Sequence, residues 1–336
     1  MITGPDGAIW FDGYYGGEHE GDAQSFIGRL GPDGSIKEFP LPMGREVNSP
    51  VSGPGGDIWF AANGTQDGDE GFRIGRISTG GQLHEYLLSQ REAAVGPIAA
   101  SGEKLWVGAL LFNRRHEGAR SVLYRVTTSP TVSVQQTLTF RRDCGVSAIA
   151  GQGDAVWFAE LCEPRDPRHP HWRAHLVRVN ATGQTARYAL PKLSYVESLT
   201  IAPDGTLWFG SFGSNGLRTE FGRITPDGGL KGYRVPNGDP GTIAVGPEGR
   251  LWFPSTIGGR AYRALNSIDA EGHLGTPVCA GPKCGLAPIG LIARPDGDLW
   301  FSAAEAHRPN GGGGGSVLIE GIYRENLPGT IARLTP

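Results

Sequence analysis

Imidazole and carboxylate side chains crowd one segment of this sequence, between Glu160 and His175. Besides these two residues, the segment contains Glu163, Asp166, His169, His171 and Trp172. Imidazole nitrogens and carboxylate oxygens are common ligands of zinc and other transition metals, so Glu160, His169 and His171 are candidate metal ligands. Their spacing fits no standard ligand motif, and the prolines of the segment suit a charged, solvated loop equally well.

A second place for chemistry is the pair Glu305 and His307. A carboxylate beside an imidazole can serve as a general acid and base, so both residues are candidate catalytic groups. An exposed pair with no joint role is the alternative. The glycine run at 311–315 that follows is too flexible to form an exact part of a site.

Aromatic and charged residues elsewhere supply candidate ligand contacts: Tyr14, Tyr15, His19, Arg114, His116, Trp172 and Glu197. The acidic residues near positions 18–22 and 67–70 could hold a hard cation through oxygen ligands. No EF-hand or other recognised calcium loop is present. The cofactor is therefore unknown, with magnesium and calcium as the options.

The cysteines pair by their places along the chain. Cys144 precedes one predicted strand and Cys162 follows the next, so antiparallel neighbours bring them together and predict a disulfide. Cys279 and Cys284 bracket a short proline-containing linker and predict a second, local disulfide. Two disulfides indicate an extracellular or periplasmic protein. Four separate buried thiols are the alternative.

An apolar-Trp-apolar triplet recurs along the whole chain, and it positions all of these residues. Its seven tryptophans, 44 to 51 residues apart, are Trp10, Trp59, Trp106, Trp157, Trp208, Trp252 and Trp300. This period is typical of the blades of a β-propeller. We expect the tryptophans to pack between adjacent blades rather than to bind a ligand.

Turn signals divide each repeat into four short strands. Pro-Asp-Gly-type turns precede the triplet, and an Ile-Gly-Arg-Ile-type strand follows it after a variable loop. No helical periodicity appears, so the sequence predicts an all-β, seven-bladed β-propeller of four-stranded blades. We expect residues 1–336 to form one domain, with blades at roughly 1–42, 43–88, 89–140, 141–191, 192–236, 237–280 and 281–336.

Strand direction predicts which face of the propeller carries function. The long loops between second and third strands, and the linkers between blades, lie on one face, where we expect a site at the channel mouth. The formal net charge of −3 is spread along the chain, which disfavours a nucleic-acid partner. No apolar run is long enough to span a membrane, and we expect a monomer that binds a small molecule or a peptide.

The two ends of the sequence predict an incomplete ring. The last blade is expected to stop at its third strand, residues 330–334 with Arg333, while residue 1 falls inside the first strand of the first blade. A closing fourth strand would then have to lie upstream of Met1. The expected result is a three-stranded last blade with an unpaired edge.

The repeat unit Gly-Pro-Asp-Gly-x-apolar-Trp-Phe, followed by Ile-Gly-Arg-Ile-Thr-Pro-Asp-Gly, resembles the streptogramin B lyase (virginiamycin B lyase) family. The resemblance is closest at residues 4–42, 52–86 and 202–236, and it is weaker in the third, fourth and sixth repeats. It implies a propeller that linearises a cyclic depsipeptide antibiotic by elimination. In that reaction a magnesium ion polarises the ester and a histidine takes the proton.

The chain departs from this family at the positions that carry its chemistry. The family's Pro-His-x-Ile elements correspond to residues 240–243 and 287–290, so Gly241 and Ile289 stand where the histidines are expected. Ala287 and Ala304 stand where its glutamates are expected, with Glu305 one residue further on. Neither glycine nor isoleucine can act as a general base, so we expect no elimination by that mechanism.

Three functions therefore remain open. The first is a lyase-like propeller that binds a small molecule or a peptide. The second is a lyase or a lactone hydrolase that uses acid/base or metal groups; the lactonase propellers, with calcium in their channel, are a precedent. The third is an extracellular protein-interaction module.

Overall fold

The computed structural model describes residues 1–15, 24–64, 71–90, 93–112, 119–129, 131–141, 144–162, 173–190, 193–213, 219–246, 249–294, 297–305, 319–326 and 330–334. Within these ranges the chain forms strands, joined by turns and by two short 3₁₀ segments, η1 (Pro54–Gly56) and η3 (Pro282–Cys284). It divides into two compact units, Met1–Tyr195 and Val196–Pro336. None of the described segments is a helix long and apolar enough to cross a membrane.

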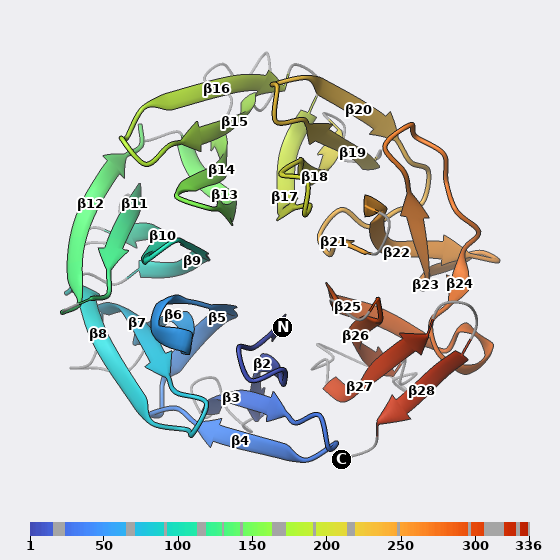
Figure 1. Cartoon of the computed structure of the whole chain (residues 1–336), viewed down its shortest axis with the longest axis horizontal. Coiled ribbons are helices and arrows are strands. Elements are labelled where there is room, and N and C mark those ends of the chain that lie inside the picture. Colours follow the sequence, from blue (N-terminus) through green and yellow to red (C-terminus); the bar gives the residue numbers. More distant parts are fainter. Residues whose placement is uncertain are drawn as a thin grey trace. The chain divides into compact units, whose positions relative to one another are not determined.

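The first unit contains four antiparallel sheets, each made of four consecutive strands (Figure 1). They are β1 (Ile2–Thr3), β2 (Ile9–Tyr15), β3 (Gln24–Leu30) and β4 (Ile36–Pro40); β5 (Arg45–Ser52), β6 (Ile58–Gly64), β7 (Gly71–Ile77) and β8 (Leu83–Ser89); β9 (Ala93–Ser101), β10 (Lys104–Phe112), β11 (Ala119–Thr127) and β12 (Ser133–Thr139); and β13 (Cys144–Gln152), β14 (Ala155–Cys162), β15 (Arg173–Val179) and β16 (Thr185–Leu190).

The second unit contains three sheets of the same kind, and the first strand of the first of them begins just before the unit boundary. They are β17 (Leu193–Ile201), β18 (Leu207–Gly213), β19 (Thr219–Ile224) and β20 (Leu230–Arg234); β21 (Ala244–Val245), β22 (Leu251–Ile257), β23 (Arg260–Ile268) and β24 (Val278–Cys279); and β25 (Leu286–Ala293), β26 (Leu299–Glu305), β27 (Ile319–Asn326) and β28 (Thr330–Leu334).

This strand order confirms the predicted all-β propeller of four-stranded blades. Each sheet places its strands in chain order, as the turn signals of the repeat require. The closure of the sheets into one seven-bladed ring, and the single-domain organisation that goes with it, stay predictions.

The last sheet corrects the expectation that the final blade has three strands. Residues 330–334 form its fourth strand, β28, which pairs with β27 (Ile319–Asn326). The register places Arg324 of β27, not Arg333, opposite Trp300. The third strand was missed because the glycine run that precedes it read as one continuous loop.

The repeat sets the register between the second and third strands in six of the seven sheets; in the sheet of β22 and β23, Trp252 lies opposite Ser267. Tryptophan of the triplet lies opposite the arginine of the Ile-Gly-Arg strand, as in the pairs Trp10–Arg29 and Trp59–Arg76. The guanidinium groups of Arg29, Arg76, Arg125, Arg178 and Arg223 lie 5.8 to 6.0 Å from the ring centroids of their tryptophans. This is a cation–π distance, and each such pair stabilises the register by about 0.5–1 kcal/mol at exposed sites.

The turn aspartate completes this contact in the first sheet. Asp6 accepts one hydrogen bond from Nε1 of Trp10 at 3.0 Å and another from Nε of Arg29 at 2.7 Å. In the second sheet, where the turn reads Pro54-Gly55-Gly56, the following residue Asp57 binds Arg76 at 2.5 Å, and Nε1 of Trp59 donates to the carbonyl of Pro54 instead. An aspartate in or just after the turn thus ties the turn to the third strand in both sheets.

The seven tryptophans of the triplet are buried, and four of them pack between neighbouring sheets of a unit, as predicted. Trp10 lies in one apolar cluster with Ile58 and Phe60 of the next sheet, and Trp208 in another with Leu251 and Phe253. Trp59 and Trp106 likewise pack against apolar residues of the sheets that follow theirs in the chain. These apolar clusters of the core therefore lie between sheets.

Glycine in the third strand makes room for the phenylalanine of the triplet. Gly75 lies opposite Phe60, and a Cβ built on it would lie 2.0 Å from Cζ of that ring. The same contact recurs at Gly28 with Phe11 and at Gly222 with Phe209. A larger residue would push the ring out of the core.

Both predicted disulfides are present. Cys144 begins β13 and Cys162 ends β14, where the register places them directly opposite each other. Cys279 ends β24 and bonds Cys284 of η3, five residues later. The two bonds are compatible with an extracellular or periplasmic location.

Replacing Gly75 by alanine should lower the free energy of unfolding by about 2 kcal/mol, because the new methyl group overlaps the ring of Phe60. Urea denaturation, monitored by tryptophan fluorescence, measures this change in the free energy of unfolding. Gly232→Ala is the matched control: this glycine lies in β20, and its added Cβ meets nothing within 4 Å. The control should be neutral or slightly stabilising. An equal loss in both variants would contradict the ring contact as the reason for the glycine.

Candidate functional site

The described residues include only part of the predicted site. His19, Arg114, His116, His169, His171, Trp172 and His307 lie outside the described residues. Tyr14 and Tyr15 end β2, and Glu305 ends β26, where the structure describes the backbone only. Glu160 and Glu197 are the two non-cysteine candidates whose side chains are described.

Glu160 is buried in β14 and has basic partners. Its Oε1 accepts a hydrogen bond from Arg187 of β16 at 2.7 Å, and its Oε2 lies 3.4 Å from Nδ1 of His175 of β15. Burial lowers the pKa of His175 more than the Glu160 carboxylate raises it. The described neighbours of Glu160 thus differ from the predicted metal ligands His169 and His171.

Glu197 lies in a group of first-strand residues of the second unit. The group consists of Glu197 of β17, the linker residues Asp239, Gly241 and Thr242 before β21, and Ile289 of β25, and we call it the first-strand site. A Cβ on Gly241 would lie 2.8 Å from Oε2 of Glu197, so the linker passes directly beside this carboxylate. Only a residue without a side chain leaves that face of the carboxylate uncovered.

Hydrogen bonds hold the linker of the first-strand site in place. Asp239 accepts the backbone N–H of Gly241 at 2.9 Å and donates its own N–H to Pro254 at 2.8 Å. The Ser198 hydroxyl donates to the carbonyl of Pro240, and Thr242 Oγ1 donates to the carbonyl of Ile289 at 3.0 Å. The linker before β21 is therefore bonded to the first strands of the sheets on either side of it in the chain, β17 and β25.

Ile289 owes its position to a β-bulge. Pro288 pairs with Ala303 and Gly290 with Ser302, which leaves Ile289 without a partner in β26, and its side chain is 42% exposed. A bulge bends the strand and redirects the extra residue. The register of the first and second strands shifts in the same way in the sheets of β5, β9 and β13.

The first-strand site contains two carboxyl groups, those of Glu197 and Asp239, whose negative charges repel each other. Burial, and then the negative charge of Asp239, raise the pKa of Glu197 above its ordinary value. A half-buried carboxylate that is further repelled by a second one favours a proton or another cation beside it. The arrangement can therefore bind a cationic group or exchange a proton with a ligand.

Sequence reasoning identified Glu197 but not Asp239. The Asp239-Pro240-Gly241 segment reads as an ordinary turn, and nothing in it signals a second carboxylate beside β17. The one available signal was its alignment with the Pro-His-x-Ile element of the family that the repeat resembles.

A second acidic group, Asp269, Glu271 and His273, has a structural explanation. Asp269 Oδ1 accepts the backbone N–H groups of residues 271, 272 and 273, and its Oδ2 contacts Arg250 and His273. These bonds close the turn between β23 and β24, so the group needs no ligand.

Residues 169–308 match the sequence model of the Virginiamycin B lyase family. The matched region, 140 of 336 residues, includes the whole first-strand site. No curated protein is significantly similar in sequence to this chain.

Three solved structures are similar in fold to this chain at low sequence identity. A puromycin hydrolase has a TM-score of 0.63 at 16% identity, over 99% of this chain and 52% of its own. The acylaminoacyl peptidase of Pyrococcus horikoshii has a TM-score of 0.63 at 13% identity, over 98% of this chain and 50% of its own. This chain thus spans about half the length of both proteins.

A third solved structure is matched by this chain over nearly the whole length of that structure. It is the β-propeller domain of the Trilobed protease from Pyrococcus furiosus, described as having an open velcro topology, with a TM-score of 0.62 at 11% identity over 98% of this chain and 92% of its own. At these identities the likeness shows the fold alone.

Replacing Glu197 by glutamine should raise the melting temperature at pH 7 and leave it unchanged at pH 4. The folded chain holds this proton more tightly than the unfolded chain, so the contribution of Glu197 to stability falls as the pH rises from the ordinary glutamate pKa through the raised one. Glutamine lacks this titration. Thermal melts followed by circular dichroism test it, with Glu271→Gln as an exposed control. An equal gain at pH 4 would exclude ionisation of Glu197 as the cause.

Proposed function

We propose that this chain is a virginiamycin B lyase-like propeller, with seven blades, that binds a small molecule or a peptide through the first-strand site. The observation that carries the proposal is the half-buried Glu197 carboxylate, raised in pKa beside Asp239 and left uncovered by Gly241. The family match over residues 169–308 supports the same region. The site lies at the channel mouth of the proposed ring.

The chemistry of the site favours a ligand with a protonated amine. An ammonium group placed between Glu197 and Asp239 relieves their mutual repulsion and makes charge-assisted hydrogen bonds to both. The exposed side chain of Ile289 adds an apolar contact for the rest of the ligand. An N-terminal peptide amine with a neighbouring apolar side chain has both features.

The family's elimination reaction fits this chain poorly. Gly241 and Ile289 stand where the family resemblance expects the histidines, and neither side chain can accept a proton. We therefore assign binding rather than that elimination to the first-strand site.

A second candidate function is an enzyme of the lyase or lactone-hydrolase class. The raised pKa of Glu197 favours it, because a carboxyl group that is protonated closer to neutral pH can donate a proton to a leaving group. Asp239 would then keep the acid protonated. The binding tests below separate this candidate from the first.

A peptide with a free amine should bind in preference to its acetylated form. We expect Gly-Phe-amide to bind at least tenfold more tightly than N-acetyl-Gly-Phe-amide, and Glu197→Gln to remove this preference, since tenfold is about 1.4 kcal/mol and charge-assisted bonds exceed that. Isothermal titration calorimetry measures both affinities, and chromatography of the recovered peptide detects turnover.

Glu271→Gln is the control for this experiment, because Glu271 is an exposed carboxylate of the same unit. It should keep the preference for the free amine. Equal affinity for the two peptides, or an unchanged preference in Glu197→Gln, would rule out the ammonium site. Conversion of the peptide, lost in Glu197→Gln, would indicate catalysis at the first-strand site rather than binding alone.

Incubation with a streptogramin B antibiotic and Mg²⁺ should leave the antibiotic cyclic. Ring opening by elimination does not change the mass, so the measurement is reversed-phase chromatography, in which the new carboxylate shortens retention. A linear product would show that another residue supplies the base, and Glu305 and His307 would be the first variants to examine.

A further inference from the structure

One face of the fourth sheet carries four side chains that bind metals in other proteins. They are Cys144 of β13, Glu160 and Cys162 of β14, and His175 of β15. The register pairs Cys144 with Cys162 and Glu160 with His175. Glu160 and Cys162 are two residues apart in one strand, so they project from the same face. Antiparallel partners share that face, and the four side chains therefore lie together.

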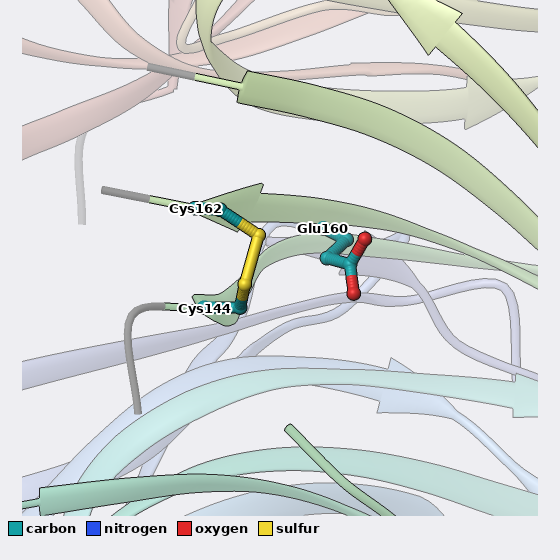
Figure 2. A group of neighbouring side chains, drawn as sticks. All are labelled: Cys144, Glu160 and Cys162. Carbon is teal, nitrogen blue, oxygen red and sulfur yellow. A yellow bond between two sulfur atoms is a disulfide. The ribbon is translucent and has the colours of Figure 1, made fainter. Parts of the chain in front are cut away.

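The distances within this group suit a small cation. One carboxylate oxygen of Glu160 and the two sulfur atoms all lie within 4.8 Å of one another (Figure 2). Nδ1 of His175 lies 3.4 Å from Oε2 of Glu160. A tetrahedral zinc ion with ligand bonds of about 2.0–2.3 Å separates its ligand atoms by roughly 3.3–3.8 Å. The two sulfurs are bonded at 2.06 Å, so they must move apart after reduction to reach that range.

Burial shields this group from water, and its hydrogen bonds leave ligand atoms such as Nδ1 of His175 available to a cation. Cys144, Glu160 and Cys162 are each more than 90% buried. Nδ1 of His175 is shielded from solvent and has no hydrogen-bond partner in the described part of the chain. Arg187 bonds Oε1 of Glu160 and so orients the carboxylate with Oε2 toward His175. Orientation of a ligand by an outer partner is the usual arrangement of metal sites.

We propose that reduction of the Cys144–Cys162 disulfide turns this face into a zinc site with Cys144, Cys162, Glu160 and His175 as ligands. A dithiol reductant transfers two electrons and two protons, which breaks the S–S bond and yields two thiols while the reductant becomes a disulfide. Zn²⁺ then displaces the two thiol protons and binds the two sulfurs as thiolates. The site is independent of the proposed ligand-binding function.

Cobalt and zinc titrations test the proposal. The protein is the full chain with Cys279→Ser and Cys284→Ser, so that every thiol comes from the proposed site. After reduction with a dithiol that is then removed under nitrogen, we expect one Co²⁺ per chain, with thiolate-to-cobalt absorption and visible bands of tetrahedral geometry. Zinc should displace the cobalt, and the oxidised protein should bind neither ion.

Single variants distinguish a four-ligand zinc site from zinc binding by the two thiols alone. Glu160→Gln and His175→Ala should each weaken zinc binding at least tenfold, within the usual range for altered metal sites. Glu271→Gln and His273→Ala, which change exposed residues of the second unit, should have no effect. Unchanged affinity in both Glu160→Gln and His175→Ala would overturn the proposal, as would the absence of metal binding after reduction.

Thiol trapping in glutathione buffers gives a readout that does not require the reduced chain to stay folded. Zinc at a hundredfold excess over its dissociation constant should shift the dithiol–disulfide equilibrium about a hundredfold, or about 60 mV. The shift should shrink in Glu160→Gln. If reduction merely unfolds the chain, zinc will bind the thiols alike in both proteins, and the proposal fails.

Discussion

The register between the second and third strands is the constraint on which each sheet depends. In the first, second and fifth sheets it places tryptophan against arginine and phenylalanine against glycine in adjacent cross-strand pairs, as in Trp59–Arg76 and Phe60–Gly75. A shift by one residue would put the Phe60 ring against a side chain and would separate Asp57 from Arg76. Because the tryptophans also pack on the next sheet, the same register fixes how neighbouring sheets of a unit pack together.

The register of the second and third strands does not fix the residues of the first strands, and both proposed sites contain residues of first strands. In the second unit β21 has only two residues, so the linker before it carries Asp239 and Gly241 to the side of Glu197. In the fourth sheet a disulfide joins the start of the first strand to the end of the second.

The repeat allowed the fold to be predicted, because each of its residues has a local role. Pro-Asp-Gly turns, Trp–Arg pairs and the cysteine pairings are all short-range or cross-strand relations that spacing reveals. The third strand of the last sheet was missed because Thr330-Ile331-Ala332-Arg333 resembles the Ile-Gly-Arg signature more closely than residues 319–326 do. Asp239 was missed because it depends on a contact between sheets, and Arg187 as a partner of Glu160 because it depends on the exact register within one sheet; composition encodes neither.

The bulge at Ile289 has a consequence for how such a repeat can change over time. The extra residue belongs to no cross-strand pair, so its identity is not tied to the register or to the tryptophan layer. A single substitution there can introduce or remove a reactive side chain while the blade keeps its stability. Lineages that inherit this repeat can thus exchange one chemistry for another at a fixed point of an unchanged scaffold.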